Sequence, residues 1–174
     1  MCTATDTPRI YVACLAAYNA GRLHGEWIDA NQDSEAIHEE IQAMLAKSPE
    51  PGAEEWAIHD YGGFGGLRLS EFEDIERVAE FGQLVAEHGP GFAAYADHVG
   101  HDYATAEGFE EAYCGQWESE VAYAEELFDE LYASEIPENL RCYVDYEAFS
   151  RDLFINDCYS VDCPEGGIYV FRNC

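Results

Sequence analysis

The acidic charge constrains this chain more than any other feature. Its 174 residues contain 36 Asp and Glu but only 8 Lys and Arg, which gives a formal net charge of -28 at pH 7. Repulsion among so many like charges destabilises any compact state. We therefore expect the charge to serve a purpose, and three purposes are physically sensible: imitation of nucleic acid, binding of many cations, or solubility in concentrated salt.

The aromatic content predicts that the chain folds despite this charge. Phe, Tyr and Trp make up 14% of the residues, whereas disordered acidic segments contain few aromatic residues. The first ten residues show neither the basic nor the apolar part of a signal peptide, and the longest apolar run, 10–18, is far shorter than the roughly 20 residues of a membrane span. We expect a cytoplasmic protein that has no membrane partner.

Residues 1–61 show strand and helix patterns in turn. Strand-like runs are predicted around 10–12, 27–28 and 56–61, and a helix is predicted over 34–46. A turn at 19–21 makes the first two strands a hairpin, and Asp33 is placed to cap the helix. The glycine cluster at 62–66 then predicts a hinge or tight turn that separates two compact units.

Residues 62–103 change to a helical period. Ser70 and Glu73 form a capping box, which predicts a helix that starts there and ends at Gly89 and Pro90. A short helix is predicted over 92–99. The apolar face of the first helix consists of Phe72, Ile75, Val78, Ala79 and Val85.

The last segment, residues 104–174, mixes helices with strands. Helices are predicted over 107–113 and 119–133 and from Asp145 to about 153, followed by a hairpin of 158–162 and 168–172 about a turn at 164–167. The predicted fold class is α+β, with three small domains: an N-terminal α+β domain (1–61), an acidic helical domain (62–103) and a C-terminal α+β domain (104–174).

The acidic residues concentrate in the middle of the chain. Residues 62–140 contain 19 acidic and 2 basic residues. In the helix at 119–133, Glu126 precedes Glu130 and Glu125 precedes Asp129 by four residues, and each such pair of like charges costs a few tenths of a kcal/mol. We therefore predict that the acidic side chains here bind a partner. The candidates are Glu71, Glu73, Asp74, Glu76, Glu80, Glu87, Glu110, Glu111, Glu118, Glu120, Glu125, Glu126, Asp129 and Glu130.

The chain contains no pattern that predicts an enzyme, a metal site or a cofactor. The run from Asp29 to Glu40 resembles an EF-hand loop, but Ser34 stands where that loop needs glycine. No nucleophile elbow, zinc-protease pair or phosphate-binding loop occurs. His98 and His101 lack a third ligand, and the seven cysteines are odd in number without a CxxC pair, which predicts free thiols.

The charge is large enough to imitate a useful length of DNA. A duplex carries one negative charge per roughly 1.7 Å of its axis. The net charge of -28 therefore corresponds to about 48 Å of duplex, or roughly 14 base pairs. A protein groove that neutralises phosphates with Lys and Arg would accept helices that display carboxylates at a similar density, without any base edges to read.

Several stretches resemble the ArdA antirestriction family of mobile genetic elements. They are RIYVACLAAYNAGRLHGEWIDANQDSEAIHEEIQAML (9–45), EEWAIHDYGGFGGLRLSEFEDIERVAEF (54–81), VAYAEELFDE (121–130) and YVDYEAF (143–149). The resemblance extends from about residue 9 to 173 and is strongest over 10–81. It places the antirestriction motif of the family at the acidic helix from Glu118 to Glu130.

The resemblance implies a fold and a partner. It implies an elongated, three-domain homodimer, joined through the C-terminal domain, that imitates bent B-form DNA. Such proteins occupy the DNA groove formed by the specificity and modification subunits of Type I restriction-modification enzymes, and so protect incoming DNA. They are not enzymes and need no cofactor or nucleic-acid partner. The alternatives are a salt-adapted acidic domain and an acidic cation-binding protein.

Overall fold

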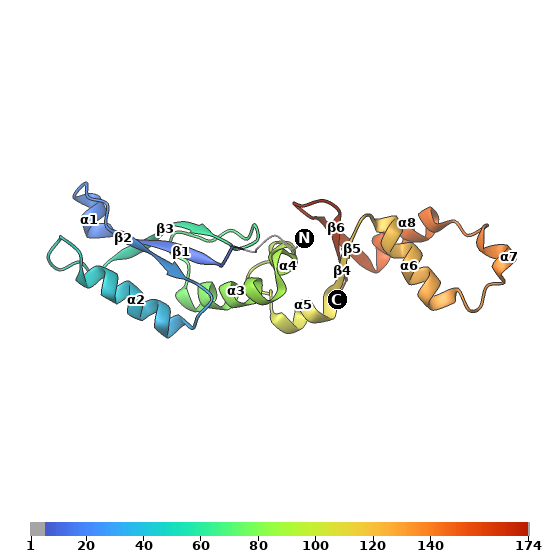
Figure 1. The fold of residues 1–174 in the computed structure, drawn as a ribbon, viewed down its shortest axis with the longest axis horizontal. Coiled ribbons are helices and arrows are strands. Elements are labelled where there is room, and N and C mark those ends of the chain that lie inside the picture. The colour runs from blue at the N-terminus through green and yellow to red at the C-terminus, as the bar shows by residue number, and fades with distance from the viewer. Residues whose placement is uncertain (1–5, 174) are drawn as a thin grey trace. The chain divides into compact units, whose positions relative to one another are not determined.

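The computed structural model describes residues 6–173, which belong to two compact units, Met1–His101 and Asp102–Cys174 (Figure 1). Residues 6–173 form eight helices and two antiparallel sheets of three strands each. The predicted α+β class is confirmed. The segments on both sides of the glycine cluster at 62–66 belong to the first unit, so the division into three domains stays a prediction.

The sheet of the first unit has the strand order β2-β1-β3. Ile10 of β1 lies opposite Ile28 of β2 and Tyr61 of β3, so the predicted antiparallel hairpin is confirmed. The connection between β1 and β2 differs from a simple turn, because it contains the short helix α1. The apolar run that predicted only strand therefore changes to helix at its midpoint. The bounds are β1 Arg9–Cys14, α1 Leu15–Asn19, β2 Gly25–Asp29 and β3 Trp56–Gly62.

The helix α2, Ser34–Ala46, begins where the sequence predicts. The carboxylate of Asp33 accepts a hydrogen bond from the Ala36 amide (2.8 Å) and so caps the first turn. Its apolar stripe is buried, and α2 packs against β1, β2 and the helix α3, Ile75–His88. Figure 1 shows α2 and α3 beside the sheet. The EF-hand-like run is thus a strand, a turn and a capped helix.

The start of α3 corrects the capping-box prediction. The Ser70 amide donates to Glu73 Oε2 (3.1 Å), but these residues form a turn, and the helix begins one turn later with Asp74 as its N-cap. The reason is tertiary: the Glu71 carbonyl accepts a hydrogen bond from the Ile58 amide (2.9 Å) and holds this segment beside β3. The side chain of Phe72, predicted to be buried, is 68% exposed.

The core of the first unit lies between the sheet and the helices α2, α3 and α4, Pro90–Val99. Gly89 ends α3 with a φ of 72°, a backbone conformation that favours glycine, and Pro90 starts α4 at once. The Phe81 and Phe92 rings, both fully buried, lie 6.0 Å apart between these two helices. Gly82 allows α3 to approach Ala30 closely, because an added Cβ would overlap the Ala30 carbonyl oxygen.

The second unit packs helices against a sheet of order β4-β6-β5. The predicted hairpin of β5 and β6 is confirmed, with Cys158 opposite Arg172 and Asp162 opposite Ile168. The sequence did not predict β4, whose register against β6 shifts between Tyr113 and Gln116. It did not predict α7 either. The bounds are α5 Ala106–Ala112, β4 Tyr113–Trp117, α6 Glu120–Tyr132, α7 Glu138–Arg141, α8 Tyr146–Asn156, β5 Cys158–Asp162 and β6 Ile168–Arg172.

Aromatic contacts hold α6 against α8. The Phe128 ring lies 5.1 Å from the Phe149 ring, and Tyr123 lies 6.1 Å from Phe154. The inner side of α6 is thus fixed, and its five carboxylates remain exposed. None of the helices formed by the described residues has the length and apolar composition of a membrane span.

Five cysteines lie in the described part of the chain, and all five are free thiols. Cys158 is buried, and desolvation raises the pKa of its thiol to about 11. Two further cysteines of the sequence, Cys2 and Cys174, lie outside the described residues.

Candidate functional site

All the carboxylates of the chain lie at the surface. Residues 6–173 contain every Asp and Glu of the sequence, and none of these 36 side chains is buried. Glu50 and Glu73 are half-buried, and the other 34 are exposed. The charge is therefore displayed to solvent, where a partner can reach it, and none of it is placed in the core.

Positive side chains neutralise little of this surface. The sequence offers 8 Lys and Arg for 36 carboxylates, so at least 28 carboxylates have no Lys or Arg of their own. Some of these cations also make other contacts: Arg141 donates to the Ala133 carbonyl (2.7 Å), and the Arg9 guanidinium lies 4.8 Å from the centre of the Trp27 ring. The fold thus leaves a strong negative field outside the protein.

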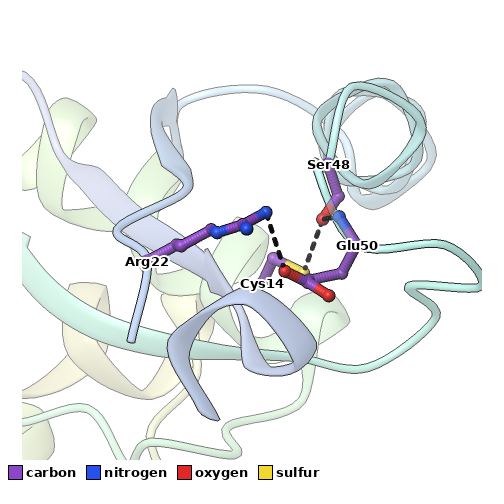
Figure 2. A network of polar contacts seen from close by, with 4 residues as sticks. All are labelled: Cys14, Arg22, Ser48 and Glu50. Atoms are coloured by element: carbon purple, nitrogen blue, oxygen red, sulfur yellow. Dashed lines mark hydrogen bonds and ion pairs between the residues drawn. The ribbon is translucent and has the colours of Figure 1, made fainter. Parts of the chain in front are cut away.

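One ion pair has a structural role. Arg22 Nη1 lies 3.1 Å from Glu50 Oε1 and joins the loop after α1 to the loop after α2 (Figure 2). In the same network, the Ser48 hydroxyl oxygen accepts a hydrogen bond from the Glu50 amide (3.2 Å) and lies 3.3 Å from Cys14 Sγ. Glu50 is outside the candidate set, and this pairing explains why it is only half-exposed.

Six of the candidate acids belong to the first unit, and half of them shape the start of α3. Glu71 Oε1 lies 3.9 Å from His59 Nε2, Glu73 accepts from the Ser70 amide, and Asp74 accepts from the Glu76 amide (2.8 Å). An acidic residue at a helix N-terminus also interacts favourably with the helix dipole. These three acids therefore stabilise local structure as well as adding charge.

The other three candidates of the first unit form a stripe on α3. Glu76, Glu80 and Glu87 are spaced by four and seven residues, which places them on one face of the helix. All three are exposed, whereas the opposite face is buried in the core. Three carboxylates over the 14 residues of α3 give one charge per about 7 Å of helix axis.

Eight candidates belong to the second unit, and α6 holds the densest group. Glu125, Glu126, Asp129 and Glu130 are exposed on α6, whereas Tyr123 and Ala124 of the same helix are buried. With Glu120, the 13 residues of α6 contain five carboxylates, or one per about 4 Å of axis. One strand of DNA has a phosphate every 3.4 Å or so. Of the other three, Glu110 and Glu111 are exposed near the end of α5, and Glu118 is exposed just before α6.

Two hydrogen bonds orient carboxylates of α6. The Ser160 hydroxyl donates to Glu120 Oε1 (2.6 Å), and the Tyr146 hydroxyl donates to Asp129 Oδ1 (3.0 Å). The hydrogen bond to Asp129 is the largest cause of a raised pKa of Tyr146, and the nearby charge of Glu125 adds to it. Tyr146 therefore stays neutral at physiological pH and keeps donating to Asp129.

The structure also shows surface features that the sequence reasoning missed. Phe72 is exposed instead of buried, and two surface clefts share Phe72 and Trp56 as lining residues. The signal that could have revealed this was Asp74, a second possible N-cap four residues after Ser70. No three His, Cys, Asp or Glu side chains of residues 6–173 are grouped so that they could hold a metal ion.

The fold and this surface define a class: small acidic α+β proteins whose carboxylates face outward from helices and turns. The family model described as antirestriction protein (ArdA) matches residues 10–165 of the chain. Because the match covers most of the sequence, the chain belongs to the ArdA antirestriction family. Comparison with curated proteins finds no match.

Proposed function

We propose that this ArdA-family protein inhibits Type I restriction-modification enzymes by occupying their DNA-binding groove as an imitation of B-form DNA. The observation that carries the proposal is the placement of all 36 carboxylates at the surface of a chain with a net charge of -28. Membership of the antirestriction family supports the same target.

The physical basis is replacement of phosphates by carboxylates. The groove between the specificity and modification subunits must neutralise a duplex, and carboxylates spaced like those of α6 offer it a similar density of charge. Binding releases the counterions held by both partners, so affinity falls steeply with salt. The mimic needs no base edges and therefore blocks enzymes of different sequence specificity.

The family resemblance supports the remaining parts of the proposal. The protein acts without catalysis or a cofactor, in the cytoplasm, where it protects incoming mobile DNA. It acts as an elongated homodimer joined through the C-terminal domain, with domains at 1–61, 62–103 and 104–174. The fourteen candidate acids contact the enzyme, and each exposed ion pair contributes about 1 kcal/mol or less to the interface.

A displacement titration tests this proposal. The purified protein is added to a Type I methyltransferase core that is already bound to labelled duplex, and release of the duplex is followed at several salt concentrations. We expect release at near-stoichiometric ratios, which weakens steeply as salt rises. A folded protein that releases no duplex at large excess would contradict DNA mimicry for that enzyme.

A further inference from the structure

One uncharged feature of the first unit is the exposed ring of Phe72 beside two surface clefts. It lies in the turn between the segment held beside β3 and the start of α3, and its side chain is 68% exposed. Trp56, the first residue of β3, is half-buried. Two clefts open beside these rings, and both Phe72 and Trp56 line each cleft.

Carboxylates surround the two rings. Glu54 and Glu55 line one cleft, and Glu73, Asp74 and Glu76 line the other. Half of the ten residues that line the two clefts are therefore acidic, and none of the ten is Lys or Arg. An exposed aromatic surface inside a ring of negative charge has a defined complement: a group that is flat, cationic and able to donate several hydrogen bonds.

Among protein side chains, arginine fits this description best. The guanidinium group is planar, stacks on aromatic faces and binds carboxylates through paired hydrogen bonds. A lysine ammonium is a compact and strongly hydrated charge, which gains less from a ring. A phosphate or a nucleic acid would be repelled by the five carboxylates.

We propose that the Phe72–Trp56 clefts bind an arginine side chain of the partner protein. This inference rests on the proposed function, in which the partner surface carries the Arg and Lys residues that otherwise hold DNA phosphates. It adds a contact that a duplex backbone cannot make, because phosphates offer no aromatic face. The contact also depends less on salt than exposed ion pairs do, since part of it is stacking. It would help the protein to compete with DNA.

The displacement titration distinguishes the contribution of this aromatic contact to binding from the contribution of the surface charge. The variant Phe72→Ala removes the ring without a change in net charge, and Leu23→Ala is the matched control, because Leu23 is 90% exposed and lies outside both clefts. We expect Phe72→Ala to weaken displacement about three- to fivefold at every salt concentration, with an unchanged salt slope. Leu23→Ala should equal the wild type.

Two more variants separate the contribution of the aromatic face of Phe72 to binding from the contribution of its apolar surface area. Phe72→Tyr keeps the aromatic face and should retain displacement, whereas Phe72→Leu keeps an apolar side chain without a π face and should behave like Phe72→Ala. Circular dichroism and thermal unfolding of each variant confirm that the fold is unchanged, as expected for an exposed side chain. Equal activity of Phe72→Ala and the wild type would overturn the arginine site and leave the proposed function intact.

A second measurement does not depend on the restriction enzyme. Calorimetric titration with capped tetra-arginine and tetra-lysine peptides gives the preference for arginine over lysine in the wild type, Phe72→Ala and Leu23→Ala. We expect Phe72→Ala alone to lower this preference. An unchanged preference would overturn the inference even if the wild type displaces DNA. A change in sedimentation of Phe72→Ala alone would instead assign the clefts to a second copy of the chain.

Discussion

At the scale of single residues, Gly82 shows how packing can reverse a helix propensity. Gly→Ala in a helix normally stabilises by up to about 1 kcal/mol. Here a Cβ on Gly82 would overlap the Ala30 carbonyl oxygen and lie 2.9 Å from the Ala30 Cβ. We expect Gly82→Ala to lower the free energy of unfolding by roughly 1–3 kcal/mol, because a backbone atom cannot move aside cheaply. Urea denaturation measures the change.

The same helix supplies the control for Gly82. Ala86 is exposed on α3, so Ala86→Gly should cost about 1 kcal/mol through propensity alone. A Gly82→Ala variant more stable than the wild type would show that α3 does not approach Ala30 as closely as the structure indicates.

The cysteines give a second prediction at this scale. Burial raises the pKa of Cys158 to about 11, so at pH 8 only about one thiol in a thousand is the reactive thiolate. Cys142 is exposed. Brief treatment with iodoacetamide at pH 8, followed by peptide mass spectrometry, should modify Cys142 long before Cys158. Raising the pH toward 11 should speed modification of Cys158 in the folded protein. Equal rates at pH 8 would mean that Cys158 is not buried.

At the scale of elements, the carboxylates of α6 are expected to favour inhibition but to lower the stability of the helix. The variant Glu125→Gln, Glu126→Gln, Glu130→Gln removes like-charge neighbours and leaves Asp129 to accept from Tyr146. Each relieved pair should add a few tenths of a kcal/mol to stability. We therefore expect a slightly higher melting temperature together with weaker displacement of DNA and a shallower salt slope. Thermal unfolding and the displacement titration measure the two effects separately.

A matched variant decides whether position matters or only net charge. Asp152→Asn, Asp157→Asn, Asp162→Asn changes the charge by the same amount in the same unit, at exposed acids outside the candidate set. If both triple variants lost displacement of DNA to the same extent, the three substituted glutamates of α6 would have no special role. A larger loss from the α6 variant would assign it a direct contact.

The elements also show what the sequence could predict. The start of α2 and the hairpin of β5 and β6 were predictable because their signals are local: a capping aspartate in one and a short turn in the other. The start of α3 was not, because a backbone hydrogen bond from Ile58 to Glu71, distant in sequence, holds the Ser70 turn away from the helix. The strand β4 was missed because it follows α5 directly and its register shifts next to Gly115, so no alternation is visible.

The surface position of the candidate acids could also be predicted from the sequence, whereas their contact with a partner stays a prediction. Surface placement of Asp and Glu is the ordinary outcome of their desolvation cost, and all fourteen candidates lie at the surface. The aromatic clefts beside Phe72 could not be chosen, because they depend on which residues from β3 and the α3 start become neighbours.

At the scale of the whole molecule, the charge predicts that salt has opposite effects on stability and on inhibition. Both units are strongly acidic, with net charges of -13 for residues 1–101 and -15 for residues 102–174. Screening of this repulsion should raise the melting temperature as salt increases, since the Debye length falls from about 30 Å at 0.01 M to about 3 Å at 1 M. The same screening weakens binding to a cationic groove.

The opposite effects of salt on stability and on inhibition distinguish a DNA mimic from a salt-adapted protein. We expect far-ultraviolet circular dichroism to show a folded chain in dilute buffer, with a melting temperature that rises steadily up to 1 M salt, while displacement of DNA declines over the same range. A salt-adapted domain would instead lose its helical signal as salt is removed, because its repulsion is tolerable only when screened. Unfolding in dilute buffer would therefore favour the salt-adapted interpretation. Loss of displacement by a protein that is growing more stable is the result expected from screening at the interface with the enzyme.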